Sequence, residues 1–79
     1  MTDREIVDKA KVFMDSEVTT VRKMRDWEFF KNNEDFRQYK KTKQAEIVGI
    51  CMFAQDLVEG CENELIAYAN KCIKELWDL

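Results

Sequence analysis

Histidine and proline are absent from the 79-residue sequence, and glycine occurs only twice. Histidine is the side chain most often used as a general base and a frequent metal ligand, so its absence argues against most enzymes and most metal sites. No nucleophile-elbow, zinc-protease or phosphate-loop motif is present either. We therefore expect a protein that is not an enzyme and that holds no cofactor. The near absence of helix-breaking residues favours helices throughout the chain.

The three cysteines, Cys51, Cys61 and Cys72, are an odd number and form no C-x-x-C pair. Each lies among apolar residues in a helical pattern, so we expect neither a disulfide scaffold nor a zinc site. The residues from Thr2 to Glu5 do not resemble a secretory or transit peptide. These features predict reduced thiols and a cytoplasmic protein.

Long apolar runs are also missing. The longest uncharged stretch, Ile47 to Gln55, is far shorter than the roughly 20 residues that span a membrane. The balance of 37% charged and 46% hydrophobic residues is typical of one small soluble domain, which we expect to cover residues 1–79. Because a core of this size is marginally stable, we expect the chain to form a homo-oligomer or to dock on a partner protein.

Apolar residues recur at steps of three and four near the N-terminus, which is the pattern of an amphipathic helix. The main stripe consists of Val7, Ala10, Met14, Val18, Val21 and Met24, and a second stripe consists of Ile6, Ala10 and Phe13. Thr2 and Glu5 have the spacing of a capping box. The pattern predicts a first helix over about residues 3–30, ending before Asn32 and Asn33, because asparagine tolerates helix ends and caps the next helix.

The rest of the chain predicts one or two further helices, depending on Gly60. If the chain breaks there, the second helix covers about residues 34–59, and the third, capped near Asn63, covers about residues 62–78. If it does not break, one helix runs through Gly60, since an internal glycine costs only about 1 kcal/mol. We favour the break. The predicted fold class is all-α, either an antiparallel helical hairpin or a small three-helix bundle.

The second helix is expected to be the most buried part of the chain, because residues 45–58 are apolar on nearly every side. Its predicted seam consists of Phe36, Tyr39, Lys43, Ile47, Ile50, Ala54 and Leu57. Ala45 and Gly49 form a small-x-x-x-small pair, which would let another helix approach closely or would form a flat part of the core. Trp77 and Leu79 are expected to fold back onto the first helix.

Charge is distributed unevenly along the chain. The net charge is −2 over residues 1–21, +4 over residues 22–43 and −5 over residues 44–79. The middle part, called here the basic segment (residues 22–43), also holds five of the nine aromatic residues. Cations and aromatic faces together suit an anionic planar ligand such as a nucleotide. The candidate binding residues are Arg22, Arg25, Trp27, Arg37, Tyr39, Lys40 and Lys41.

The basic segment also has a purely structural interpretation, which is the more economical one. Trp27, Phe30 and Phe36 lie where two helices meet and would plug the end of the hairpin. Lysines such as Lys41 and Lys43 would then form an ordinary solvated face. Duplex nucleic acid is not an expected ligand, because the net charge of the whole chain is −3.

The function predicted from these features is that of a small non-enzymatic intracellular binding protein, an adaptor or inhibitor that acts on a partner protein through helical faces. Proteins of this kind are common among phage-encoded host-takeover and counter-defence factors. One alternative is an oligomeric protein that sequesters a phosphate-containing nucleotide at the basic segment. A second alternative is a structural subunit of a larger assembly.

Overall fold

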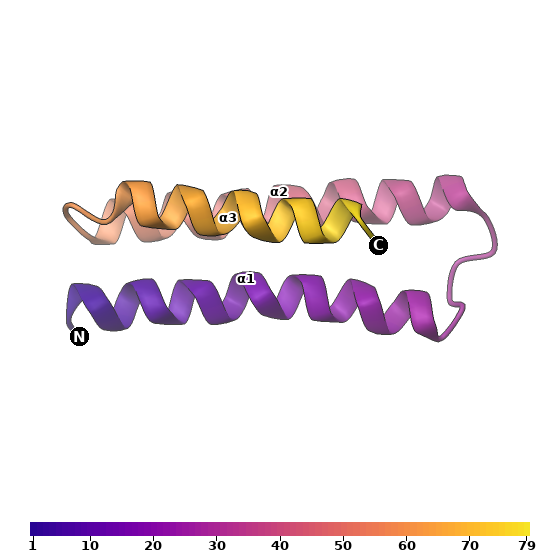
Figure 1. Ribbon diagram of the computed structural model, residues 1–79, viewed down its shortest axis with the longest axis horizontal. Coiled ribbons are helices and arrows are strands. Elements are labelled where there is room, and N and C mark those ends of the chain that lie inside the picture. The colour runs from indigo at the N-terminus through magenta and orange to yellow at the C-terminus, as the bar shows by residue number, and fades with distance from the viewer.

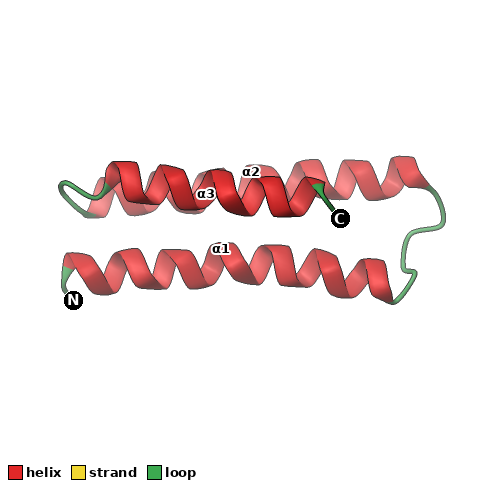
Figure 2. Ribbon diagram, in the orientation of Figure 1, coloured by secondary structure: helices red, strands yellow, loops and turns green.

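The computed structural model describes all residues, 1–79, and contains three α-helices and no strand (Figure 2). The helices are α1 (Asp3–Asp26), α2 (Asn33–Leu57) and α3 (Glu62–Trp77). Helix α3 lies back along both α1 and α2, and the molecule is a rod of 43 × 16 × 16 Å (Figure 1). The predicted all-α fold class is confirmed, in its three-helix form. None of the three helices combines the length and the apolar character needed to cross a membrane.

Helix α1 begins as its sequence predicts. The Thr2 side chain accepts a hydrogen bond from the backbone N–H of Glu5, and the Glu5 carboxylate accepts one from the backbone N–H of Thr2. This capping box satisfies two backbone donors that would otherwise lack partners. The main apolar stripe is buried from Val7 to Val21, so α1 presents one continuous face to the core.

The predicted end of α1 is wrong by about one turn. The helix ends at Asp26, and Glu28 adopts a positive φ of 53°. The backbone N–H of Phe29 donates to the carbonyl of Met24, and that of Glu28 donates to Arg25, which is a Schellman arrangement. Glycine usually occupies the left-handed position of this motif, so a glutamate there gave no sign of a helix end.

Gly60 separates α2 from α3, as the favoured interpretation predicts, and the alternative of one continuous helix is wrong. Its φ of +78° lies in the left-handed region, where glycine carries no steric penalty. The resulting turn lets α3 run back along the bundle. Helix α3 starts at Glu62, after Cys61, whose side chain makes no capping hydrogen bond. The predicted cap near Asn63 is therefore wrong.

One hydrophobic core joins the three helices, and all 13 of its buried residues are apolar. They are Val7, Ala10, Met14, Val18, Val21, Ile47, Cys51, Ala54, Val58, Leu65, Ala69, Cys72 and Leu76. Burying one large aliphatic side chain completely contributes roughly 1.5–3 kcal/mol. Met14, Ile47, Leu65 and Leu76 are the largest such side chains, so they contribute most to the stability of the isolated chain.

Helix α2 is much less buried than its sequence predicts. Its buried residues are Ile47, Cys51 and Ala54. By contrast, Met52 is 61% exposed and Phe53 is 68% exposed. The reason is geometric, because α1 and α3 cover only one side of α2 while residues 45–58 are apolar on nearly every side. Half of this apolar surface consequently remains uncovered.

The predicted seam of α2 is correct at its N-terminal end, where Phe36 and Tyr39 pack against the core, and wrong at its C-terminal end. Leu57 is half-exposed, and Val58 takes its place in the core. Lys43 lies in the seam as predicted there, but it is paired with acids rather than solvated. A helix packed against two neighbours buries a face between them, which moves the centre of its buried stripe away from the one expected for a hairpin.

The C-terminal residues fold back onto the bundle, but Trp77 contacts α2 rather than α1. Its indole Nε1 donates a hydrogen bond of 2.6 Å to the side-chain oxygen of Gln44. The Lys40 ammonium lies 4.9 Å from the centre of the Trp77 ring. Leu79 packs against the core. The predicted contact between Trp77 and the first helix is thus wrong, and the contact with α2 ties down the end of α3.

Candidate binding surfaces

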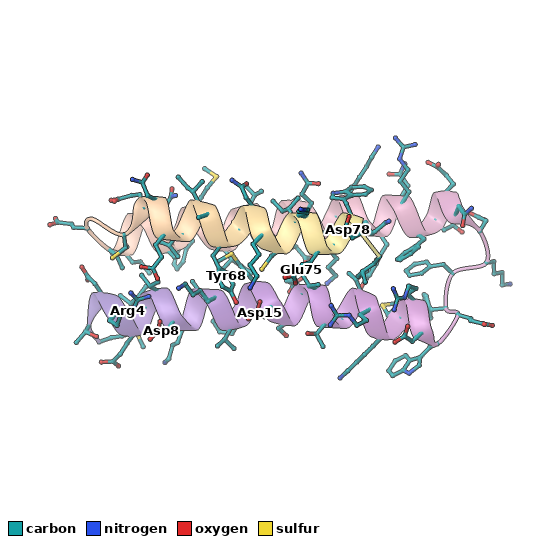
Figure 3. All side chains as sticks on the ribbon, viewed as in Figure 1. Arg4, Asp8, Asp15, Tyr68, Glu75 and Asp78 are labelled. Atoms are coloured by element: carbon teal, nitrogen blue, oxygen red, sulfur yellow. The ribbon has the colours of Figure 1, made fainter.

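Polar contacts close the seam between α1 and α3. Arg4 donates hydrogen bonds of 3.1 and 2.5 Å to the two carboxylate oxygens of Glu64, and the ammonium of Lys11 lies 2.5 Å from that carboxylate. Asp8 also pairs with Arg4, at 3.1 Å (Figure 3). The Arg4 and Lys11 hydrogen bonds lower the pKa of Glu64 to about 2. A two-pronged arginine–carboxylate pair is directional, so it fixes how α3 is aligned along α1.

Further along this seam, Asp15 accepts a hydrogen bond of 2.6 Å from the Tyr68 hydroxyl and lies 3.6 Å from the sulfur of Cys72 (Figure 3). The hydrogen bond to Asp15 raises the pKa of Tyr68 to about 12. Burial, together with the charge of Asp15, raises the pKa of the Cys72 thiol to about 12. A thiol that stays protonated is a poor nucleophile. This cluster therefore stabilises the seam and provides no reactive group.

The other two cysteines are also free thiols. Cys51 is buried, and burial raises the pKa of its thiol. Cys61 is partly buried, and its sulfur contacts the backbone carbonyl of Glu59. No group of three or more histidine, cysteine, aspartate or glutamate residues is arranged to hold a metal ion.

A partly buried cation lies in the seam between α1 and α2. The Lys43 ammonium is 3.0 Å from a carboxylate oxygen of Glu17 on α1 and 3.0 Å from one of Glu46 on α2. Its side chain is only 16% exposed, so the predicted solvated position of Lys43 is wrong. Burial raises the pKa of Glu17, whereas hydrogen bonds from Glu17 and Lys43 lower the pKa of Glu46. The two acids therefore share one cation between them.

The aromatic residues of the basic segment fill the end of the bundle where α1 joins α2. The rings of Phe30 and Phe36 are stacked with centroids 5.3 Å apart, and the ring of Tyr39 is 5.0 Å from that of Phe30. Helix α3 ends before this point (Figure 1), so the rings cover apolar surface that a third helix covers elsewhere. Trp27 does not join them and is 73% exposed. The expected plug therefore forms from the phenylalanines without Trp27.

Most cations proposed for ligand binding already have partners. Arg25 lies 2.9 Å from Asp26, and Arg37 lies 3.9 Å from a carboxylate one turn away on α2. The Lys40 ammonium lies over two aromatic rings, at 4.6 and 4.9 Å from their centroids. Lys41, by contrast, forms no ion pair within the chain. A phosphate ligand would have to displace existing contacts at three of these positions.

The seven candidate residues are also not brought together. Arg22, Arg25 and Trp27 come from the end of α1, and the other four come from α2. The hollow at this end of the bundle contains only Arg25 of the seven. Tyr39 is half-buried against Phe30, so one of the two rings proposed to stack on a base is occupied. The nucleotide site stays a prediction that the geometry does not favour.

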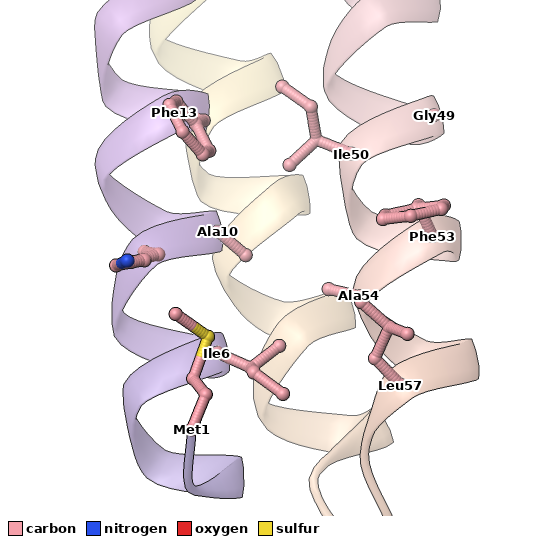
Figure 4. Close-up of a pocket in the computed structure, with 10 residues that line it drawn as sticks. Met1, Ile6, Ala10, Phe13, Gly49, Ile50, Phe53, Ala54 and Leu57 are labelled. Atoms are coloured by element: carbon pink, nitrogen blue, oxygen red, sulfur yellow. The ribbon is translucent and has the colours of Figure 1, made fainter.

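An apolar groove of about 400 Å³ runs between the N-terminal half of α1 and the C-terminal half of α2 (Figure 4). We call it the α1–α2 groove; its lining residues are Met1, Ile6, Lys9, Ala10, Phe13, Gly49, Ile50, Phe53, Ala54 and Leu57. Ala10 and Ala54 form the floor, because both are buried. Phe13 and Phe53 form the rims, because they are 59% and 68% exposed. Small side chains below large ones leave a hollow that the chain itself does not fill.

Only one charged side chain, that of Lys9, lines the α1–α2 groove. Lys9 takes part in none of the ion pairs of the molecule. One helical turn beyond the groove, the Lys43 cluster replaces the apolar lining with paired charges. The groove is thus an apolar surface with a free positive charge at its edge.

The sequence did not identify this groove as a site. Phe53 and Leu57 were expected in the core, and Phe13 belonged to a second stripe that was expected only to widen the packed face of the first helix. The signal that could have revealed it is the excess of apolar surface, since two apolar stripes on α1 and the apolar stretch of residues 45–58 exceed what two neighbouring helices can cover. Which part stays uncovered depends on the packing angles, which the sequence does not specify.

Comparison with family models, with curated proteins and with solved structures finds no match to this chain. No relative therefore suggests a ligand or a partner. Among the exposed surfaces of the chain, the α1–α2 groove is lined almost entirely by apolar residues.

Proposed function

We propose that this chain is a non-enzymatic binding protein, an adaptor or inhibitor, that holds an amphipathic helix of a partner protein in the α1–α2 groove. The observation that carries the proposal is the pair of exposed rings, Phe13 and Phe53, above a floor of two alanines. Contiguous exposed apolar surface of this kind is characteristic of interaction sites. Aromatic residues beside a pocket are also the residues that most often dominate binding energy.

The dimensions of the groove suit a short helical segment. Its walls run from Ile6 to Phe13 on α1 and from Ile50 to Leu57 on α2, and seven residues of helix rise about 10 Å. This length accommodates about two turns, so a partner would insert apolar side chains at positions i, i+3, i+4 and i+7. The unpaired ammonium of Lys9 favours a partner helix with a carboxylate at the edge of its apolar face.

The test compares two neighbouring positions on α1. Phe13 lines the groove and is 59% exposed, whereas Val12 lies outside it and is 63% exposed. Tagged wild-type protein and the variants Phe13→Glu and Val12→Glu are incubated with an extract of the source cells, after circular dichroism has shown equal helicity. We expect a partner that wild type and Val12→Glu retain and that Phe13→Glu loses. A helical peptide from that partner, with an apolar face, should bind wild type and Val12→Glu but not Phe13→Glu.

Two results contradict the proposal: retention of the same partner by Phe13→Glu, or binding by a partner peptide that lacks an apolar helical face. The alternatives have separate signatures in the same preparations. A nucleotide-sequestering protein would gain thermal stability in a nucleotide panel, and Arg37→Glu would remove that gain. A structural subunit would polymerise as its concentration rises. The binding protein proposed here should respond to neither nucleotides nor Arg37→Glu.

A further inference from the structure

A second apolar surface lies on the side of α2 that faces away from the bundle. We call it the outer face of α2; its residues are Lys41, Ala45, Val48, Gly49, Met52 and Asp56, which follow one another at steps of three or four apart from the adjacent pair Val48 and Gly49. Met52 is 61% exposed and Val48 is 38% exposed, and Phe53 borders the face on the groove side. Helix α3 borders one edge of this face, where Val48 and Met52 line a hollow together with Ile66 and Ile73 of α3, yet Met52 stays exposed.

The order of residues along the outer face is self-complementary. Lys41 stands at its N-terminal end and Asp56 at its C-terminal end, and between them small and large residues alternate in the order Ala45, Val48, Gly49 and Met52. If two copies align this face in opposite directions, Lys41 of each copy approaches Asp56 of the other, and Ala45 approaches Met52. Neither Lys41 nor Asp56 forms an ion pair within the chain. Small side chains thus meet large ones, and unpaired charges meet charges of opposite sign.

We propose that two copies of the chain form a dimer through the outer face of α2, with the two α2 helices antiparallel and crossing at Gly49. Such a pairing uses the same patch on both copies, so the assembly closes as a twofold dimer and does not grow into a filament. This inference goes beyond the proposed function: the two surfaces meet at Gly49 and Phe53, but the α1 wall of the groove with Phe13 belongs to the groove alone.

Gly49 provides a separate argument for a close contact at this point. A Cβ atom added at Gly49 would meet nothing within 4 Å, so the isolated chain gains no packing from glycine there. Glycine inside a helix lowers helix stability by about 1 kcal/mol relative to alanine. A crossing helix accounts for it, because the missing side chain lets two backbones approach. The monomer alone gives no such reason.

The first experiment measures the mass of the full chain in solution by sedimentation equilibrium. We expect wild type to reach twice the chain mass of 9.4 kDa and Met52→Glu to remain at the chain mass. Val12→Glu, an equally exposed apolar-to-acid change on α1, should dimerise like wild type. A wild-type chain that stays monomeric up to about 1 mM, or a Met52→Glu variant that still dimerises, overturns the proposal.

The second experiment tests the antiparallel alignment by exchanging charges. Lys41→Glu places two acids together at both ends of the dimer, and we expect it to weaken dimerisation about tenfold at low salt. The double variant Lys41→Glu with Asp56→Lys restores opposite charges and should recover the wild-type dissociation constant. A double variant no tighter than the single one overturns the alignment. Phe13→Glu should leave the dimer intact, so failure of the groove and failure of the dimer are distinguishable.

Discussion

Helix α1 packs against α3 along one seam and against α2 along the other, and the two seams are closed by different means. On the α3 side, the ion pairs of Arg4 and Lys11 with Glu64 and the hydrogen bond that Asp15 accepts from Tyr68 bridge the solvent-facing edge. On the α2 side, a single hydrogen bond of 3.3 Å from the backbone N–H of Glu59 to the Asp3 carboxylate lies at the end of the molecule, and the residues between Ile6 and Phe13 line the apolar α1–α2 groove. A bundle that needed only stability would bridge both edges in the same way. The open seam is therefore where we place the function.

The same difference predicts where substitutions destabilise the fold. Leu65 is fully buried beside the closed seam, whereas Leu57 is 51% exposed at the open one. We expect Leu65→Ala to lower the free energy of unfolding by about 2–5 kcal/mol, through lost burial and a new cavity. Leu57→Ala should lower it by less than about 1 kcal/mol. Urea denaturation followed by circular dichroism measures both, and equal losses would contradict the division into a packed and an open side.

The two glycines test the difference between the closed and the open side through smaller expected changes in the free energy of unfolding. Gly49 lies within α2 on the open side, and an added Cβ atom would meet no neighbour there, whereas Gly60 has a φ of +78°. We expect Gly49→Ala to raise the free energy of unfolding of the monomer by about 1 kcal/mol. Gly60→Ala should lower it by about 1–2 kcal/mol, because an alanine is strained in the left-handed region. Both are measured at protein concentrations where the chain is monomeric.

The direction of each change in the free energy of unfolding tests one structural claim. If Gly49→Ala destabilises the monomer, then glycine is required within the fold, and its use as a crossing point between copies loses its support. If Gly60→Ala is neutral, then the turn between α2 and α3 tolerates another conformation, and the alignment of α3 depends on its contacts with α1 and α2.

Much of the fold could be predicted from the sequence, because local signals specify it. The stripe from Val7 to Val21, the capping box at Thr2 and the break at Gly60 each follow from residue spacing or residue type. The end of α1 could not be predicted, since the left-handed residue there is Glu28 and not glycine. The rule that glycine marks a helix end fails here, because a non-glycine residue adopts the strained left-handed conformation.

The candidate site was harder to predict, because it depends on what remains uncovered. Phe53 has an apolar pattern that fits a core position, and only the placement of α1 and α3 leaves it exposed. Conversely, the basic segment is conspicuous in the sequence, yet Arg25 is paired with Asp26 and Tyr39 packs on Phe30. Composition identified the charged and aromatic residues of the basic segment, whereas the packing of the helices decides which side chains remain exposed.

The ion pairs of the closed seam are expected to have the smallest effect on stability, because they face solvent and water weakens their attraction. Their contribution should nevertheless depend on pH in a defined direction. Glu64 has a pKa of about 2 in the folded chain, against about 4.3 for a glutamate in an unfolded chain. Its contribution is therefore fully present above the unfolded pKa and is lost as the pH falls from there towards 2.

Urea denaturation of wild type and Glu64→Gln between pH 7 and pH 2 tests this expectation. The wild-type advantage should be constant from pH 7 to about pH 5 and should then shrink as the pH falls, because protonation of Glu64 removes its attraction to Arg4 and Lys11. Glu62→Gln is the matched control, since Glu62 lies in the same first turn of α3 and forms no ion pair. If the Glu64→Gln difference stayed constant down to pH 2, the closed seam would owe its alignment to burial and to the Tyr68–Asp15 hydrogen bond. The contrast with the open seam would then be one of packing and not of charge.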